Sequence, residues 1–231
     1  MKIRGLVIIA AAAAMILSSC NTKSSVTGTK VKSSDDSLAY ALGIANYFYY
    51  MTDSLDINPV LIAKGMLDAK DGKNTLDEET AQTYVMTYMQ NRQMEQLKKR
   101  YASNIDEGEK YLAENKKRDG IQETTSGLQY EVVTMGTGEK PGPTDVVKVH
   151  YTGMLTDSTV FDSSVDRGEP VQFTVNQVIQ GWQEGLQLMP VGSKFKFYIP
   201  FELGYGEQGT GPIPPYSTLM FDVELLEIVK Q

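Results

Sequence analysis

The residues that most often carry reactive chemistry are scarce in this chain. Its 231 residues include one histidine, His150, and one cysteine, Cys20. A hydrolytic triad needs a histidine beside a nucleophile, and a zinc site needs several histidine or cysteine ligands. Neither kind of site can be assembled here from its usual side chains. We therefore expect no cofactor and no metal.

Aromatic side chains are the remaining candidates for a site. Trp182 is the single tryptophan, and its indole N–H would be awkward to satisfy in a sealed core, which favours a position at an opening. Tyr151 and Phe221 fall on the inward faces of two expected strands. Tyr205 lies between two glycines, where a plain turn residue and a functional residue are equally reasonable. An apolar cleft with one or two placed donors is the kind of site that such residues can build.

The charge of the chain argues against nucleic acid as a partner. The full chain has 22 basic and 29 acidic residues and a net charge of −7. Without residues 1–19, which contain Lys2 and Arg4 and no acid, 20 basic residues face 29 acidic ones and the net charge is −9. Nucleic-acid binding depends on neutralising phosphates with lysine and arginine. No nucleic-acid partner is therefore expected.

The first 20 residues have the pattern of an export signal. A short basic start precedes an apolar run at 6–17 that is too short to span a bilayer comfortably. Two serines then lead to Cys20, and the block resembles a bacterial lipoprotein signal peptide with LSSC at the lipobox. The resemblance implies cleavage after residues 1–19 and acylation of Cys20. The alternative is an ordinary secretory signal with an incidental cysteine.

These features predict an exported protein held to a membrane by its lipid. Several acyl chains on Cys20 would anchor it stably, whereas one chain holds only marginally. Asn21 offers no retention signal for the inner membrane, so we expect the outer membrane, facing the periplasm. Residues 20–34 are polar and rich in serine, threonine and lysine, which predicts a flexible tether. With its cysteine acylated, the fold must depend on packing without disulfides.

Residues 35–119 have the spacing of helices. Apolar residues recur three or four positions apart in DSLAYALGIANYFYYM, and PVLIAKGMLDAK begins with Pro59, which suits a first helical turn. Thr75 and Glu78 then fit a capping box with Thr75 as N-cap. No proline or glycine follows until Gly108, so one helix of about thirty or more residues is expected. This region is predicted as an all-helical domain with a long connecting helix.

In residues 120–231 the apolar residues recur at every second position, the spacing of a strand, instead of every three or four positions. Five segments alternate inward apolar and outward residues: GLQYEVV, VVKVHYTGM, VQFTV, KFKFYIP and LMFDVEL. Between the third and fourth lies VIQGWQEGLQLM, whose helical stripe includes Ile179 and Trp182 and which Pro190 ends. The expected fold class is therefore α+β, with a five-stranded antiparallel sheet curled around one helix after the all-helical domain.

Six strings in this region occur in the order of a known family. They are VKVHYTGML, FDSS, VIQGWQEGL, MPVGSKFKFYIP, GYGEQG and IPPYSTLMFDVELL, across residues 147–226. Together they resemble the FK506-binding-protein (FKBP) family of peptidyl-prolyl cis/trans isomerases. The helical region resembles the dimerisation domain of Mip-type and FkpA-type bacterial members through YALG and GMLDA. The resemblance implies an isomerase of Xaa-Pro bonds in exported polypeptides, with chaperone activity, a homodimer, and sensitivity to macrolide inhibitors.

Prolyl isomerisation requires no reactive side chain. Twisting the bond is slow because it sacrifices amide resonance. Water stabilises the planar, dipolar amide, so a catalyst can exclude water and hold the twisted form. By resemblance, Trp182 lies under the proline ring, and the Ile179 backbone N–H and Tyr205 hydroxyl donate to substrate carbonyls. Asp162 is a polar rim contact that Arg167 is expected to pair with.

The resemblance thus gives two sets of candidates. The catalytic candidates are Tyr151, Asp162, Ile179, Trp182, Tyr205 and Phe221. The substrate-binding candidates are Phe161, Val171, Val178 and Ile213, of which Val171 stands where many members have an aromatic wall residue and Ile213 lies in the loop over the site. The GEQGTGPIPP loop has neither an aromatic residue nor histidine at its tip. These two departures bear on substrate preference and macrolide affinity.

Simpler explanations exist for several candidates. Phe161 and Phe221 are also explained as core residues, Asp162 with two serines as a turn, and His150 as an outward strand residue. At the level of function, the alternative is an FKBP-fold binding module or holdase chaperone with little catalysis. A surface lipoprotein that binds host material has no residue in its support.

Overall fold

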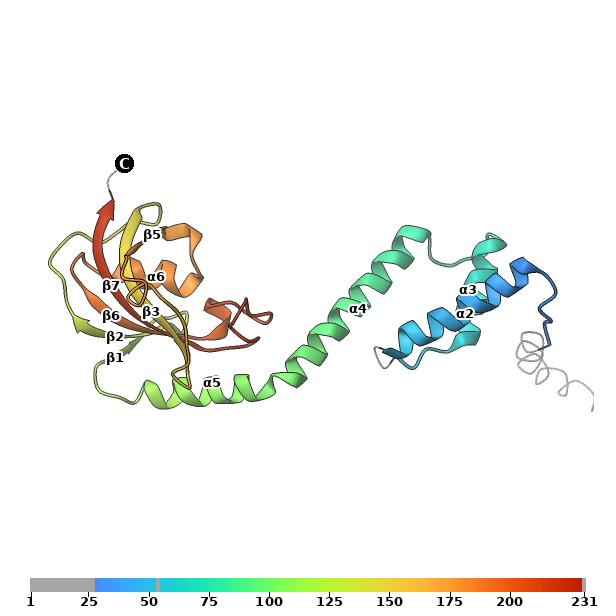
Figure 1. The fold of residues 1–231 in the computed structure, drawn as a ribbon, viewed down its shortest axis with the longest axis horizontal. Helices are drawn as coiled ribbons and strands as arrows, with labels where there is room; N and C mark the ends of the chain where they lie inside the picture. Colours follow the sequence, from blue (N-terminus) through green and yellow to red (C-terminus); the bar gives the residue numbers. More distant parts are fainter. Residues whose placement is uncertain (1–27, 53–54, 230–231) are drawn as a thin grey trace, which may run out of the picture. The chain divides into compact units, whose positions relative to one another are not determined.

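The structure, a computed structural model, describes residues 28–52 and 55–229. The expected signal peptide, the lipidated Cys20 and tether residues 20–27 lie outside the described residues. Figure 1 shows helices α2 to α5, followed in the sequence by a sheet that holds the short helix α6. The chain forms two compact units that divide within α4, between Thr83 and Tyr84. Each unit is described by itself.

The first unit contains α2 (Ser34–Thr52), α3 (Pro59–Lys70) and the start of α4 (Glu78–Arg100). Pro59 opens α3 as expected, and Asn58 caps it by accepting a hydrogen bond from the Val60 N–H at 2.9 Å. None of the helices in the described part of the chain combines the length and the apolarity that crossing a bilayer requires.

The predicted capping box is wrong. The structure begins α4 at Glu78, and the Asp77 carboxylate accepts from the Thr80 N–H at 2.7 Å. Asp77 therefore caps the helix, two positions after Thr75. An aspartate is at least as good an N-cap as a threonine, so the local competition favours the later start.

The expected single long helix is interrupted at Tyr101. The structure has α4 up to Arg100 and α5 (Ala102–Asn115), and the Tyr101 backbone at φ −108°, ψ 23° lies outside the α-helical region. Hydrogen bonding continues through the bend, from the Tyr101 N–H to the Leu97 carbonyl at 3.0 Å. The direction of α5 is set by its contacts with the sheet, which local sequence does not reveal.

The second unit is built on a seven-stranded antiparallel sheet. The strands are β1 (Ile121–Glu123), β2 (Gln129–Thr134), β3 (Val146–Leu155), β4 (Val160–Ser163), β5 (Val171–Thr174), β6 (Lys194–Ile199) and β7 (Leu219–Val229). Their order is β1-β2-β6-β7-β3-β4, and β5 pairs with the first part of β3. The five expected strands are present, and β1 and β4 are additional. The predicted α+β fold class is confirmed.

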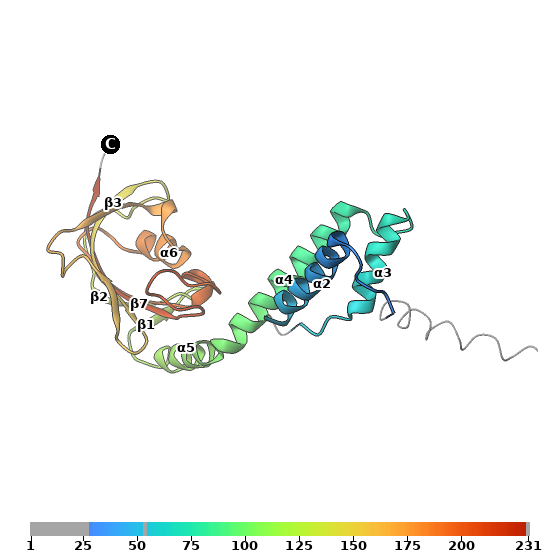
Figure 2. The same ribbon diagram turned by 45° about the vertical axis from the view of Figure 1, so that its right-hand side comes forward.

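The inner face of the sheet holds the core. The register aligns Tyr151 with Val223 and Gly153 with Phe221, so the apolar residues of alternate positions point to one side. Helix α6 (Gln180–Leu188) packs there, and Figure 2 shows the sheet curling around it. A Cβ at Gly185 would lie 2.7 Å from ring atoms of Phe197, so only glycine allows this close approach.

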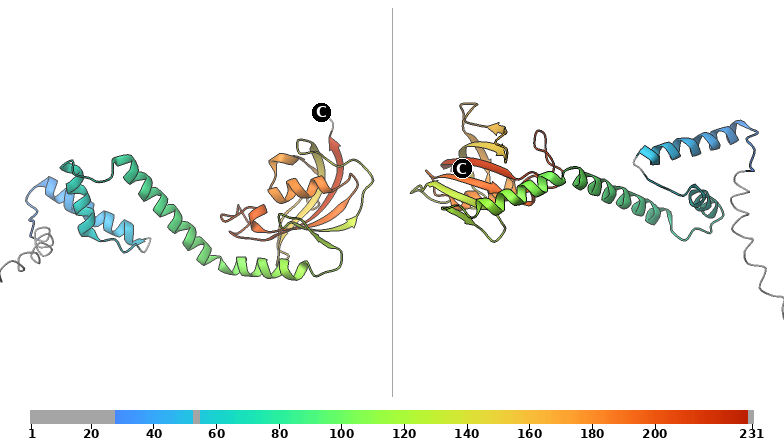
Figure 3. Two further views of the ribbon diagram at one scale, coloured as in Figure 1. Left: turned by 180° about the vertical axis from the view of Figure 1, so that it is seen from behind. Right: turned by 90° about the horizontal axis from the view of Figure 1, so that it is seen from below.

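The outer face of the sheet is covered at one end by α5. Tyr198 points outward yet is only 4% exposed. The Tyr111 hydroxyl lies 2.9 Å from the sulfur of Met220, and the Asn115 amide donates to Gln129 at 2.9 Å. Two views in Figure 3 show α5 lying along the sheet. The expected domain boundary at 119–120 falls after this helix, whereas α5 packs within the unit that contains the sheet.

Candidate functional site

A cavity of about 310 Å³ opens between the inner face of the sheet and the start of α6. Its walls come from β3, β4, β5, β7, the short helix η1 (Val175–Gln177) and the turn that follows η2 (Phe201–Leu203). Eight of the ten candidate residues line it. The lining residues are Tyr151, Phe161, Asp162, Phe173, Gln177, Val178, Ile179, Trp182, Tyr205 and Phe221.

The floor of the cavity is an aromatic cluster centred on Trp182. The rings of Tyr151, Phe173 and Phe221 lie with centroids 5.3, 5.6 and 5.2 Å from the indole, all in edge-to-face arrangements. Such pairs add to the burial of apolar area. Trp182 is 4% exposed, and among the described residues no acceptor bonds its buried N–H. The floor is therefore a closely packed aromatic surface that contains one buried N–H group without a partner in the described part of the chain.

Asp162 places one negative charge at the rim. Its carboxylate accepts hydrogen bonds from the Tyr151 hydroxyl and from Arg167, as expected for this arginine. Burial raises the pKa of Asp162, but the hydrogen bonds from Tyr151 and Arg167 outweigh it and hold the pKa below its ordinary value. Burial, and then the hydrogen bond to Asp162, raise the pKa of the Tyr151 hydroxyl. The site thus keeps an ionised carboxylate beside a neutral phenol.

The backbone of Tyr151 is held by Ser164, a residue that sequence reasoning treated only as part of a turn. The Ser164 side-chain oxygen accepts from the Tyr151 N–H at 2.8 Å, and the Ser164 N–H donates to the Tyr151 carbonyl at 3.0 Å. His150 Nδ1 lies 3.1 Å from the same oxygen, on the outer side of the sheet. His150 therefore has a structural contact and does not line the cavity.

Two hydrogen-bond donors lie at the mouth of the cavity. Ile179 precedes α6, and its carbonyl accepts from the Trp182 and Gln183 N–H groups at 2.9 and 3.0 Å. The first N–H groups of a helix lack partners within the helix, so this end can donate to a ligand. Tyr205 is 39% exposed, and burial followed by the charge of Asp162 raises the pKa of its hydroxyl. The phenol is therefore protonated and able to donate near neutral pH.

Two candidates lie outside the cavity, and two unpredicted residues line it. Val171 packs against the core from β5, and Ile213 is buried in the loop before β7. Phe173 and Gln177 line the cavity in addition. Phe173 shares the inward face of β5 with Val171, so its parity could have identified it. Its ring supplies an aromatic wall close to the place where Val171 lacks one.

The residues described by the structure form no cluster of three or more histidine, cysteine, aspartate or glutamate side chains that could hold a metal ion. What the cavity offers is an apolar floor, a single carboxylate at the rim and two neutral donors. This arrangement can enclose a small apolar ring whose neighbouring carbonyl groups need hydrogen bonds.

The fold and this site define the class of protein. The profile for FKBP-type peptidyl-prolyl cis-trans isomerase matches residues 137–226, and the profile for the domain amino terminal to FKBP-type peptidyl-prolyl isomerase matches residues 35–132. The chain belongs to the FKBP-type peptidyl-prolyl cis-trans isomerases, and the family expected from the six sequence strings is confirmed.

Individual relatives cover most of the chain. FKBP-type peptidyl-prolyl cis-trans isomerase FkpA of Aeromonas hydrophila is 47% identical over 214 residues, which are 87% of this chain and 79% of that protein. Outer membrane protein MIP of Legionella longbeachae is 38% identical over 95% of this chain and 96% of its own length. The crystal structure of FkpA from Escherichia coli matches with a TM-score of 0.57 at 35% identity, over 86% of this chain and 98% of that one. The chain is thus a peptidyl-prolyl isomerase.

The lowered pKa of Asp162 predicts a pH dependence of stability. The carboxylate stabilises the folded protein fully above its ordinary pKa of 3.8, and the contribution is lost as the pH falls through the lowered folded-state value. We expect Asp162→Asn to lower the free energy of unfolding near pH 7 and to lose this difference as the pH falls below 3.8. Denaturant unfolding of both proteins over this pH range measures the difference.

Asp166→Asn provides the control, because Asp166 is an exposed carboxylate on the turn that follows β4. Its difference from the unmodified protein should stay small throughout. A constant difference for Asp162→Asn from neutral to strongly acid pH would contradict the assignment.

Proposed function

We propose that this isomerase acts on Xaa-Pro bonds of exported proteins, with the aromatic cavity above Trp182 as its catalytic site. The observation that carries the proposal is the cluster of rings around Trp182, because it supplies an apolar surface at the base of the cavity on which a proline ring can pack. Isomerisation of short peptides needs this cavity alone. Chaperone action on unfolded clients is proposed to need the helical unit as well.

The mechanism follows from the energetics of the amide. A planar prolyl amide is more polar than the twisted one, so transfer out of water raises the ground state more than the transition state. The Ile179 N–H and the Tyr205 hydroxyl would hold the flanking carbonyl groups, and the Asp162 charge would orient the polar side of the bond. Each tenfold gain in rate requires a preference of about 1.4 kcal/mol for the twisted form. The same cavity is proposed to accept macrolide inhibitors.

Replacing the floor tests this assignment. We expect Trp182→Leu to lower kcat/KM for a short Xaa-Pro peptide by about tenfold or more, because the loss of a large aromatic contact removes about 1.4 kcal/mol or more of transition-state preference. Trp182→Phe keeps a ring and should retain more activity. The measurement is the rate of peptide isomerisation, repeated with a proline-limited refolding substrate.

Tyr130→Phe is a matched control, because Tyr130 lies on β2 and its hydroxyl bonds Gln122 at 2.8 Å, away from the cavity. Its rate should equal that of the unmodified enzyme. An unchanged rate for Trp182→Leu in a folded protein would remove the cavity from the mechanism. It would favour the alternative, a holdase with the FKBP fold.

We propose further that the first unit joins two copies of the chain. Its helices expose large apolar side chains on several sides, including Leu42, Tyr47 and Met66, which are 53%, 52% and 68% exposed. A cavity of about 610 Å³ between α2 and α3 is lined mainly by apolar residues. Exposed apolar helix surfaces of this kind are normally buried against another surface. A second copy of the chain, related by two-fold symmetry, presents the same apolar surface and can cover them.

Light scattering tests the dimer. Residues 28–231 should have twice the mass of one chain at micromolar concentration, and Leu42→Glu should give a monomer, because a charge would be buried in the apolar contact. Lys70→Glu, at the exposed end of α3 and outside the cavity lining, should leave the dimer intact. A monomeric unmodified protein would contradict the proposal.

We also propose that the protein is exported and held by lipid on Cys20, in the outer membrane facing the periplasm. The support is the LSSC sequence and the similarity to a relative that is called an outer membrane protein. Several acyl chains on one cysteine give stable anchoring. The lipid would act as a tether for the two units and takes no part in catalysis.

Membrane partition tests the anchor. Cys20→Ala should move the protein from the membrane fraction to the soluble fraction of cells, because acylation needs the cysteine sulfur. Asn21→Ala should remain with the membrane. If Cys20→Ala also stays in the membrane fraction, the anchor lies elsewhere and the segment is an ordinary signal.

A further inference from the structure

Helix α5 is part of the unit that contains the sheet, and side-chain hydrogen bonds hold it there. The Asn115 amide donates to the Gln129 side chain at 2.9 Å, and Gln129 donates to the Leu112 carbonyl at 3.0 Å. Asn115 and Gln129 are both buried. Buried amides with satisfied partners fix geometry, since the loss of one partner leaves the other uncompensated. The C-terminal half of α5 is therefore held in one position against strand β2.

The N-terminal half of α5 reaches the loop between η2 and β7. The Asn104 side-chain amide donates to the Pro215 carbonyl at 2.9 Å. One turn later, Gly108 is buried directly against the side chain of Thr218, and a Cβ at Gly108 would lie 3.2 Å from Thr218 Cβ and closer still to its hydroxyl. The helix therefore holds this loop at two places, Pro215 and Thr218.

The held segment is bonded to the turn that carries Tyr205. Tyr216, next to Pro215, donates its backbone N–H to the Gly206 carbonyl at 3.1 Å. Tyr216 is 2% exposed, and its ring lies 5.2 Å from that of Phe201, the first residue of η2. Its backbone has φ +59°, a conformation that costs energy for a residue with a side chain. Such a conformation persists when the surrounding structure determines it, here through the bond to Gly206 and the contact with Phe201.

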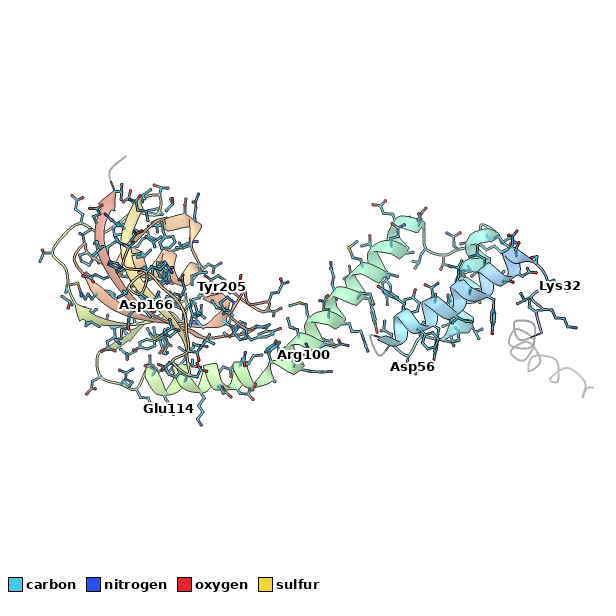
Figure 4. The ribbon with its side chains drawn as sticks, in the orientation of Figure 1. Lys32, Asp56, Arg100, Glu114, Asp166 and Tyr205 are labelled. Carbon is cyan, nitrogen blue, oxygen red and sulfur yellow. The ribbon has the colours of Figure 1, made fainter. Side chains whose placement is uncertain are left out.

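These contacts form a short path from α5 to the cavity: Asn104 to Pro215, Tyr216 to Gly206, and Gly206 to its neighbour Tyr205. Figure 4 labels Tyr205 in this loop and Glu114 on the exposed side of α5. Tyr205 lies in a turn and is 39% exposed, so its backbone is not held by the hydrogen bonds of a strand. Its position therefore depends on how the loop is held.

We propose that Asn104 is a positioning residue for catalysis, which places the Tyr205 hydroxyl through the Pro215–Tyr216 segment, with Gly108 as the second contact of the same helix. The proposal deepens the proposed function, since it rests on the role of Tyr205 as a donor to the substrate. It makes α5 a component of the catalytic unit as well as a connection to the helical unit.

The test is a double-mutant cycle in the full-length chain. Asn104→Asp has the same shape but presents only acceptor atoms to the Pro215 carbonyl, so it removes the bond without a cavity. We expect it to lower kcat/KM for a short Xaa-Pro peptide by about threefold to tenfold, the range for one lost and unfavourable hydrogen bond. In a Tyr205→Phe background the same change should cost less than about twofold, because two residues that act together are not additive.

The cycle distinguishes a failure of the donor role of Tyr205 from a failure of the positioning role of Asn104. If Tyr205→Phe alone has the activity of the unmodified enzyme, the proposed donor role of Tyr205 fails. If Tyr205→Phe is impaired but Asn104→Asp is fully active, or costs the same factor in both backgrounds, the positioning role is overturned while the donor role stands. Asp106→Asn, an exposed neighbour on α5, is the control and should leave activity unchanged.

Gly108→Ala provides an independent variant. Its Cβ would collide with the Thr218 side chain and push α5 away from the loop. We expect a loss of kcat/KM that Thr218→Ala in the same chain partly restores, because it removes the hydroxyl that the new methyl group meets. Loss without any recovery in the double variant, or no loss in Gly108→Ala, would contradict the positioning role.

Discussion

The edge-to-face packing of the Trp182 indole against three rings determines where a site can exist in this fold. Tyr151, Phe173 and Phe221 come from three different strands, so the cluster forms only when the register is correct. The indole itself comes from α6, which approaches the sheet closely because Gly185 lies against Phe197. The same side-chain contacts therefore hold the core together and shape the cavity, so a substitution that disturbs the packing would also change the site.

The negative charge of Asp162 at the edge of this apolar cluster is stabilised by two hydrogen-bond donors. Burial disfavours an ionised Asp162, and the hydrogen bonds from Tyr151 and Arg167 more than compensate. The same Tyr151 packs on the indole with its ring and binds the carboxylate with its hydroxyl. The polar and apolar parts of the site thus meet in one residue, Tyr151, whose backbone is held by Ser164 from the turn after β4.

Much of the fold followed from periodicity, and the wrong or missing predictions have three different physical causes. Alternation placed Tyr151 and Phe221 inward, and the helical stripe placed Trp182 beneath them, because period and parity are local properties. The short strands β1 and β4 carry too few residues for a pattern. The break at Tyr101 and the covering of Tyr198 by α5 depend on contacts between distant segments. Thr75 and Asp77 are both suitable N-caps for α4, and in the structure Asp77 is the residue that caps it.

The chain has one tryptophan, and that residue forms the floor of the cavity. Its ultraviolet emission on excitation at the red edge of protein absorption therefore arises from the site alone. Any molecule that enters the cavity changes the polarity and quenching around a single fluorophore. Ligand affinities can accordingly be titrated on the unlabelled protein, and the spectrum has no background from other indoles.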